Sequence, residues 1–238
     1  MKVYDAIIRQ TAETLEGLPA RVLEPGAPAP EGDRNELVLR REAAFELGEG
    51  SLPSVAFTAV TSDPALVERD EICLIGPDLG EIGGDCAFAR AALIRTDEID
   101  ERGDEAAFAV IKNIELKKYA VSAKGYMVRA SALTNREQVR VSRKALAAGL
   151  DFAAVGSLYI AKYRENPHVR AVKLLFITLP SASYAALDTL AGQADGVTRA
   201  LNHALADVSM NCRTCEWKPV CDAVNGMKEL HQRAAAQH

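Results

Sequence analysis

Apolar and polar positions follow helical spacing in some segments of the chain and strand-like spacing in others. Over residues 2–15 the apolar positions recur every three or four residues, which predicts an amphipathic helix that ends at Gly17 and Pro19. Further helices are expected at residues 105–119, 143–148, 151–163, 181–190 and 198–208. Strands are expected where short runs are rich in β-branched, aromatic or other apolar residues, at residues 36–40, 54–60, 71–75, 88–95, 126–129, 138–141 and 169–178.

These elements do not alternate with the strict period of a doubly wound parallel sheet. The pattern therefore favours an α+β fold, in which a mixed sheet is covered by packed helices. The last part of the chain is different, because a group of cysteines is followed by a polar helical segment at residues 222–236. We expect one α+β domain over residues 1–208 and a short Cys-rich helical tail over residues 209–238.

A glycine-rich loop is expected at residues 76–85, with the sequence GPDLGEIGGD. Glycine tolerates backbone conformations that other residues avoid, so such a loop either turns tightly or lets a ligand approach the backbone closely.

Composition places the protein among globular chains, since 48% of the residues are hydrophobic and 26% are charged. No apolar run approaches the roughly 20 residues that a membrane-spanning helix requires. The first ten residues carry Lys2, Asp5 and Arg9 and do not resemble a signal peptide. We therefore expect a cytoplasmic protein with no membrane contact, and the odd number of cysteines, five, argues against a disulfide framework.

The net charge of −5 conceals a basic block. Residues 111–173 hold thirteen Lys or Arg and four Asp or Glu, a net charge of +9 for that stretch. One interpretation is a site for an anionic ligand, such as a phosphorylated cofactor, or for an acidic partner. The other is a set of solvated surfaces whose charges scatter in three dimensions.

Three of the cysteines, Cys212, Cys215 and Cys221, follow a C-x2-C-x5-C spacing. Thiolates at this spacing can converge on one centre, and zinc sites and iron–sulfur clusters need three or four of them. The alternative is that they are buried, reduced cysteines without a metal. A metal site needs a fourth ligand, for which Cys86, Cys73, His203 and His231 are candidates. Cys86 is preferred because it directly follows the glycine-rich loop, and a [4Fe–4S] cluster is favoured over zinc.

Residues 124–191, in particular the segment from GYMVRASALTNREQVRVSRKALAAG to VKLLFITLP, resemble the β-subunit (acetyl-CoA synthase) family of the carbon monoxide dehydrogenase/acetyl-CoA synthase complex. The resemblance extends over about residues 71–221 and includes the Gly76-Pro77-Asp78 loop. It implies the fold of the middle domain of that family, a cubane bound by the cysteines, and contact with other one-carbon or corrinoid proteins. It also implies binding of coenzyme A, for which Arg129, Arg136 and Arg140 are the candidate residues because arginine suits phosphate groups.

The chain departs from this family in one respect that concerns the reaction. The family holds nickel with a Cys-Gly-Cys motif, and this sequence contains no Cys-x-Cys pair. The resemblance therefore implies a truncated relative that acts as an accessory subunit, and it leaves open whether the chain is itself an acyltransferase.

Two other classes remain as alternatives. RecB-like nuclease modules also carry a C-x2-C-x5-C trio with a remote cysteine, and Glu115-Leu116-Lys117 provides their Glu-x-Lys letters within a segment expected to be helical. The other alternative is a non-catalytic scaffold in which a metal only fastens the tail. The sequence contains no Walker loop, no dinucleotide-binding glycine motif and no serine-nucleophile motif, and contact with nucleic acid is not expected.

Overall fold

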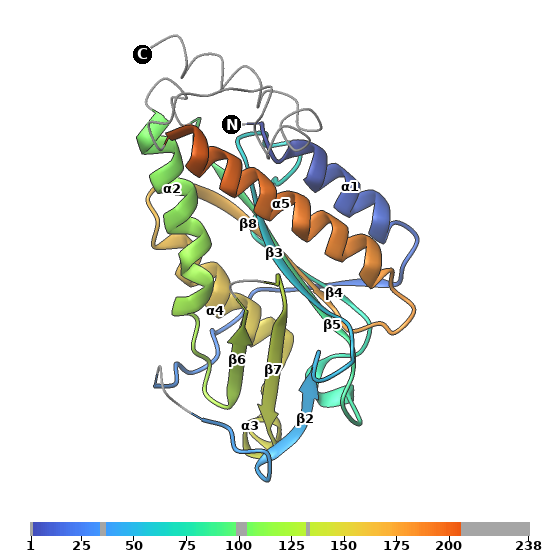
Figure 1. The fold of residues 1–238 in the computed structure, drawn as a ribbon. Coiled ribbons are helices and arrows are strands. Elements are labelled where there is room, and N and C mark those ends of the chain that lie inside the picture. The colour runs from blue at the N-terminus through green and yellow to red at the C-terminus, as the bar shows by residue number, and fades with distance from the viewer. Residues whose placement is uncertain (1, 34–36, 99–103, 132–133, 206–238) are drawn as a thin grey trace.

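The computed structural model describes residues 2–33, 37–98, 104–131 and 134–205 (Figure 1). The helices in these ranges are α1 (Asp5–Leu15), α2 (Asp104–Lys117), α3 (Arg143–Ala147), α4 (Phe152–Arg164) and α5 (Tyr184–Leu205), with short 3₁₀ turns η1 (Leu79–Glu81) and η2 (Lys118–Ala120). The strands are β1 (Ala20–Leu23), β2 (Ala43–Leu47), β3 (Ser54–Thr61), β4 (Glu71–Ile75), β5 (Phe88–Thr96), β6 (Tyr126–Ala130), β7 (Glu137–Ser142) and β8 (Val169–Ile177).

The larger sheet has five strands in the order β1-β4-β8-β5-β3. It is mixed, because β4 is parallel to β8 and β3 is parallel to β5, while β5 and β8 are antiparallel, as are β1 and β4. Nearly every residue of β3, β5 and β8 is buried, which is why these strands appear in the sequence as continuous apolar runs. The expected mixed sheet with packed helices is confirmed.

The smaller sheet is antiparallel, with the order β2-β7-β6. Residues of β7 alternate between buried and half-buried positions, so this sheet turns one face toward the core. That face meets the larger sheet where β7 contacts β3 and β5. β6 forms one edge of the smaller sheet.

Helices enclose the larger sheet. Helices α1 and α5 contact each other and β3, whereas α4 contacts β4 and β8 and lies behind the sheet in the view of Figure 1. Helix α2 contacts both α5 and α4. Stacked rings of Phe88, Phe152 and Phe176 fill the space between α4 and the sheet. Among the described residues, no helix combines the length and apolar character needed to cross a membrane.

Two expectations from the sequence are wrong. Residues 37–40, the described part of the strand expected at 36–40, form no strand, because Leu37 is 70% exposed and the strand that pairs with β7 is β2, a few residues later. The two helices expected at 181–190 and 198–208 are one helix over the described residues, α5. Its buried positions continue at helical spacing across Gly192 (Leu187, Leu190, Ala191, Ala194, Val197 and Ala200), so packing outweighs the low helix propensity of glycine.

Candidate functional site

A fully buried ion pair lies where β5 and β7 meet. The Arg90 guanidinium donates from Nε to Glu137 Oε1 at 2.7 Å and from Nη2 to Oε2 at 2.6 Å, and the two side chains are 0% and 1% exposed. Arg90 occupies the middle of an otherwise apolar part of β5, and Glu137 is the first residue of β7. This two-point contact therefore joins the larger sheet to the smaller one.

The backbone of Glu137 is held in place by Ser54, the first residue of β3. The Ser54 hydroxyl donates to the Glu137 carbonyl oxygen at 2.7 Å and accepts from the Glu137 N–H at 3.0 Å. Three strands thus fix the position of the carboxylate.

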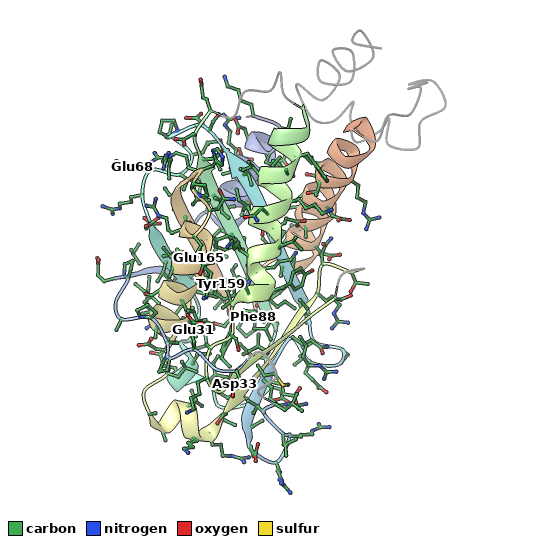
Figure 2. All side chains as sticks on the ribbon, turned by 90° about the vertical axis from the view of Figure 1, so that its left-hand side faces the viewer. Glu31, Asp33, Glu68, Phe88, Tyr159 and Glu165 are labelled. Carbon is green, nitrogen blue, oxygen red and sulfur yellow. The ribbon has the colours of Figure 1, made fainter. Side chains whose placement is uncertain are left out.

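Three buried tyrosines surround the pair. The ring centroid of Tyr159 lies 4.7 Å from Arg90 Cζ, close enough for a cation–π contact, and the Tyr163 ring is 6.4 Å from that of Tyr159. Figure 2 shows Tyr159 near Phe88 in the interior of the molecule. Among the described residues, the hydroxyls of Tyr126, Tyr159 and Tyr163 and the Nη1 atom of Arg90 have no hydrogen-bond partner. Buried polar groups in this state are rare, and they mark this cluster as unusual.

Burial and nearby charges shift the pKa values of three groups in this cluster, Arg90, Tyr126 and Tyr159. Burial lowers the pKa of Arg90, but the charge of Glu137, its hydrogen bonds to the guanidinium and the nearby tyrosines Tyr159 and Tyr163 together hold that pKa well above the ordinary value. Burial raises the pKa of both Tyr126 and Tyr159, and the contact of Tyr159 with Arg90 offsets part of this rise. Arg90 therefore stays charged, and the Tyr126 and Tyr159 hydroxyls stay neutral, near pH 7.

A small cavity lies beside this cluster. It has a volume of about 150 Å³ and is bounded by β6 (Tyr126, Met127, Val128 and Ala130), by η2 and residues 121–123, and by Val38. Ligand pockets usually measure about 300–1,000 Å³, so this cavity can receive one side chain or a molecule of a few atoms.

The glycine-rich loop at residues 76–85 turns tightly. Gly76 has φ of +111°, and a Cβ atom at this position would lie 2.5 Å from the backbone nitrogen of Leu179. The Asp78 carboxylate accepts hydrogen bonds from the N–H groups of Leu79 and Phe152, so it caps η1 and the start of α4. Burial raises the pKa of Asp78. The contacts of Gly76 and Asp78 thus assign this part of the loop a structural role.

Of the four proposed metal ligands, only Cys86 lies within the described residues, because Cys212, Cys215 and Cys221 fall in the range 206–238 outside them. Cys86 is half-buried, and its N–H donates to the Glu46 carbonyl oxygen at 3.2 Å. Burial, followed by the charge of Asp85, raises the pKa of its thiol to about 11. In the part of the chain that the structure describes, no group of three or more His, Cys, Asp or Glu could hold a metal ion.

The three proposed coenzyme A residues occupy different environments. Arg140 donates to Glu46 Oε1 and to the Val38 carbonyl oxygen, both at 2.9 Å. Arg136 donates to three carbonyl oxygens of the turn at residues 48–52. Arg129, on β6, is exposed and makes no ion pair or side-chain hydrogen bond with any described residue. Only Arg129 therefore has a guanidinium available for an anion without the loss of an internal contact.

The Glu115-Leu116-Lys117 triplet lies at the end of α2, as its sequence context predicts. Lys117 pairs with Glu165 at 2.7 Å, and Glu115 pairs with Lys118 at 3.5 Å. A nuclease site of the RecB type needs these letters on a strand next to a second acid, so the described geometry does not favour that alternative.

Sequence reasoning missed the ion pair and its tyrosines. The available signal was a charged residue, Arg90, within the apolar segment at residues 88–94. A buried arginine needs a partner, and Glu137 lies 47 positions later in the chain, which no local pattern indicates.

The described part of the chain combines a mixed sheet, a buried ion pair and a small cavity, and none of these features is specific to one family. In keeping with this, no protein-family model matches the chain, and no curated protein is significantly similar to it.

Proposed function

We propose that this protein binds an iron–sulfur cluster and acts as an accessory or partner subunit in one-carbon metabolism, as its resemblance to the acetyl-CoA synthase family implies. The observation that carries the proposal is the C-x2-C-x5-C spacing of Cys212, Cys215 and Cys221. All three follow the end of α5 by at most sixteen residues. Buried thiolates need a nearby cation, and iron supplies one.

The proposed function extends to location and partners. Corrinoid or other one-carbon proteins are the partners that an accessory subunit of this kind would contact, and the cytoplasm is where they would meet it. The sequence provides no nickel motif, so this proposal assigns no acetyl-CoA synthesis to the isolated chain.

If Cys86 is the fourth ligand, the segment between α5 and Cys212 has to bring the tail cysteines back to it. The Cys86 thiol is close enough to Tyr184, the first residue of α5, to contribute to the raised pKa of that phenol. The 22 residues of α5 span about 33 Å from there to Leu205. The seven residues from Leu205 to Cys212 reach at most about 25 Å. A cluster bound by both Cys86 and Cys212 therefore requires residues 206–212 to run back alongside α5. Substitution of Cys86 tests whether it is a ligand.

Anaerobic purification followed by iron, sulfide and zinc analysis tests the proposal. We expect about four irons per chain and a broad visible absorption band, because four thiolates hold one cubane. Cys212→Ala should abolish the band, and Cys86→Ala should weaken it if Cys86 is the fourth ligand. Cys73→Ala is the matched control, since Cys73 is buried within β4, and it should leave the iron content unchanged.

Three results would change these conclusions. One zinc per chain without iron would refute the iron–sulfur cluster and retain a metal site. Free, titratable thiols at all three tail cysteines would refute the metal site altogether. Full iron content in Cys86→Ala would assign the fourth ligand to another residue.

The coenzyme A part of the proposal now depends on Arg129. Calorimetry on the reduced protein should show coenzyme A binding that Arg129→Ala weakens. Arg69→Ala, which removes an exposed arginine before β4, should leave it unchanged. An absence of heat with the unaltered protein would refute coenzyme A binding.

A further inference from the structure

Part of the β6 backbone is unpaired. Ser142 N–H donates to the Gly125 carbonyl oxygen, and Ser131 N–H donates to that of Arg136. In an antiparallel pair, residues whose backbone groups point toward the partner strand alternate with residues whose groups point away. The backbone groups of Met127 and Arg129 therefore point toward β7, and those of Val128 and Ala130 point away from it.

No described residue accepts or donates a hydrogen bond at the outward backbone groups of Val128 and Ala130. Val128 is half-exposed, Ala130 is exposed, and both residues line the small cavity described above. A strand edge in this condition can pair with a strand from another chain.

Apolar side chains surround this edge. The 150 Å³ cavity runs along β6 and is bounded on its other sides by Lys118 and Tyr119 of η2, by residues 121–123 and by Val38. Among the exposed large hydrophobic side chains of the described residues, Tyr119 lines this cavity, and Leu37 and Leu39 flank the lining residue Val38 in the sequence. Exposed apolar patches of this kind mark interaction sites more often than single exposed residues do.

The charge along the same edge is positive. Arg129 and Lys124 are exposed, and neither side chain has an ion-pair partner among the described residues. Two acids lie on the neighbouring segment (Figure 2): Glu31, which forms a β-bridge with Ala123 and an ion pair with Lys162, and Asp33, whose backbone carbonyl accepts a hydrogen bond from Ser122 at 3.1 Å. A second copy of this chain would bring the same cations against each other, whereas an acidic segment would complement them.

We propose that the free edge of β6 is a docking site for an extended, acidic segment of a partner protein, which pairs with it as an added strand. Side chains of a strand point alternately to its two faces, so Val128 and Ala130 share the face of the buried Tyr126, and Arg129 lies on the other. The added strand therefore alternates apolar residues, which meet the cavity, with acidic residues, of which one lies opposite Arg129. None of the residues of this site is a proposed cluster ligand.

The probe is a fluorescein-labelled heptapeptide that alternates glutamate with valine or leucine, titrated into the full chain and followed by fluorescence anisotropy. We expect saturable binding together with at least about tenfold slower hydrogen exchange at the Val128 and Ala130 amides, because an added strand protects them. A peptide of the same composition, with its glutamates in one block, should bind less tightly and give no such protection.

Charge reversal provides the second test. Arg129→Glu should weaken binding of the glutamate peptide by about tenfold and strengthen binding of the matching lysine peptide. Arg69→Glu is the control for net charge and should change affinity by less than about twofold. Ala130→Pro removes an outward N–H, which an edge strand tolerates, and should also weaken binding.

Two results would overturn the proposal. The first is an absence of saturable binding by the alternating peptide, or binding that matches the block peptide and leaves Val128 and Ala130 unprotected. The second is concentration-dependent dimerisation in analytical ultracentrifugation that protects the same two amides without peptide, which would assign the edge to a second copy of the chain.

Discussion

At the scale of single residues, the interior of this protein is most unusual around Arg90. Its pair with Glu137 is formed in a region from which water is excluded, so the attraction between the charges is offset by the cost of removing both from solvent. The geometry is favourable, because two hydrogen bonds of 2.6 and 2.7 Å join the groups. Removal of one partner should therefore lower the free energy of unfolding more than removal of both.

We expect Arg90→Met to lower the free energy of unfolding by about 3–5 kcal/mol, because it leaves the Glu137 carboxylate buried without a counter-charge. The double variant Arg90→Met/Glu137→Leu should recover part of this loss, since no isolated charge remains. Urea denaturation monitored by circular dichroism measures both effects.

Lys117→Met is the matched control for this prediction. It removes the partner of Glu165, whose side chain is 47% exposed, and water replaces the lost contact at a cost of less than about 1 kcal/mol. If the double variant lost as much stability as the two single variants together, the stability would not depend on charge pairing.

The thiol of Cys86 gives a prediction on pH dependence. Its pKa of about 11, raised by burial and by Asp85, means that almost no thiolate exists at pH 8 in metal-free protein. Alkylation by iodoacetamide, measured by peptide mass mapping, should therefore speed up with pH until about pH 11. A thiol with an ordinary pKa of about 8.5 would reach a plateau much earlier.

The raised pKa of the Cys86 thiol also makes the stability of the fold depend on pH in a known direction. Because the folded state raises the pKa, Cys86 contributes stability below the pKa of the unfolded chain and loses it as the pH rises toward 11. Asp85→Asn keeps the oxygen that accepts the Glu46 N–H and removes the charge, so it should move the alkylation profile to lower pH. A plateau near pH 9 in the unaltered protein would contradict both expectations.

At the scale of elements, two helical glycines show how packing decides the effect of one substitution. Gly192 lies in α5 with open space around it, since a Cβ atom there would meet nothing within 4 Å. Gly156 lies in α4, where a Cβ atom would come within 2.7 Å of Ile72 Cδ1 on β4. Gly156 therefore lets α4 approach the sheet closely.

We expect opposite effects from alanine at these two positions. Gly192→Ala should raise the free energy of unfolding by about 0.5–1 kcal/mol, because alanine loses less backbone entropy in a helix. Gly156→Ala should lower it by about 1–3 kcal/mol, because Ile72 has to move. Thermal and urea denaturation of both variants measure the difference, and equal changes would show that contact with Ile72 does not control this position.

At the scale of the whole molecule, folding distributes the basic block over several surfaces. Many of its charges are matched by acids from other parts of the chain, among them Glu46, Asp70, Glu71 and Asp97. Lys162 binds both Glu31 at 3.0 Å and Glu165 at 3.3 Å, and Figure 2 shows these two acids near each other. The net charge of +9 in residues 111–173 therefore does not form one anion site, and Lys124 and Arg129 at the β6 edge are among the cations of this block that have no ion-pair partner in the described ranges.

The two sheets also differ in how far helices cover them. Helices cover the larger sheet, while the smaller sheet presents the outward edge of β6 to solvent. Both sheets have an exposed edge strand, the four-residue β1 in the larger sheet and β6 in the smaller one, and β6 is the edge that borders the cavity.

The segments that sequence reasoning located correctly are those whose burial is nearly complete or strictly periodic. β3, β4, β5 and β8 are apolar runs bounded by turn residues, and α1 and α4 begin and end near their predicted limits. β1 was not predicted, since three of its four residues are exposed and only pairing with β4 makes it a strand. The strand expected at residues 36–40 is found instead at Ala43–Leu47 (β2), where it pairs with β7.

By itself, the sequence determined the local periods, the α+β class and the spacing of the tail cysteines, because these depend on residues within one or two turns of each other. Only the tertiary structure decided that Arg90 meets Glu137, that Arg136 and Arg140 bind carbonyl oxygens or an acid, and that Arg129 has no partner within the described part of the chain. The physical reason is that such pairings join positions as much as 102 residues apart. Many acids of the chain could pair with these arginines, and the packing of the two sheets determines which of them do. No local sequence pattern contains this information.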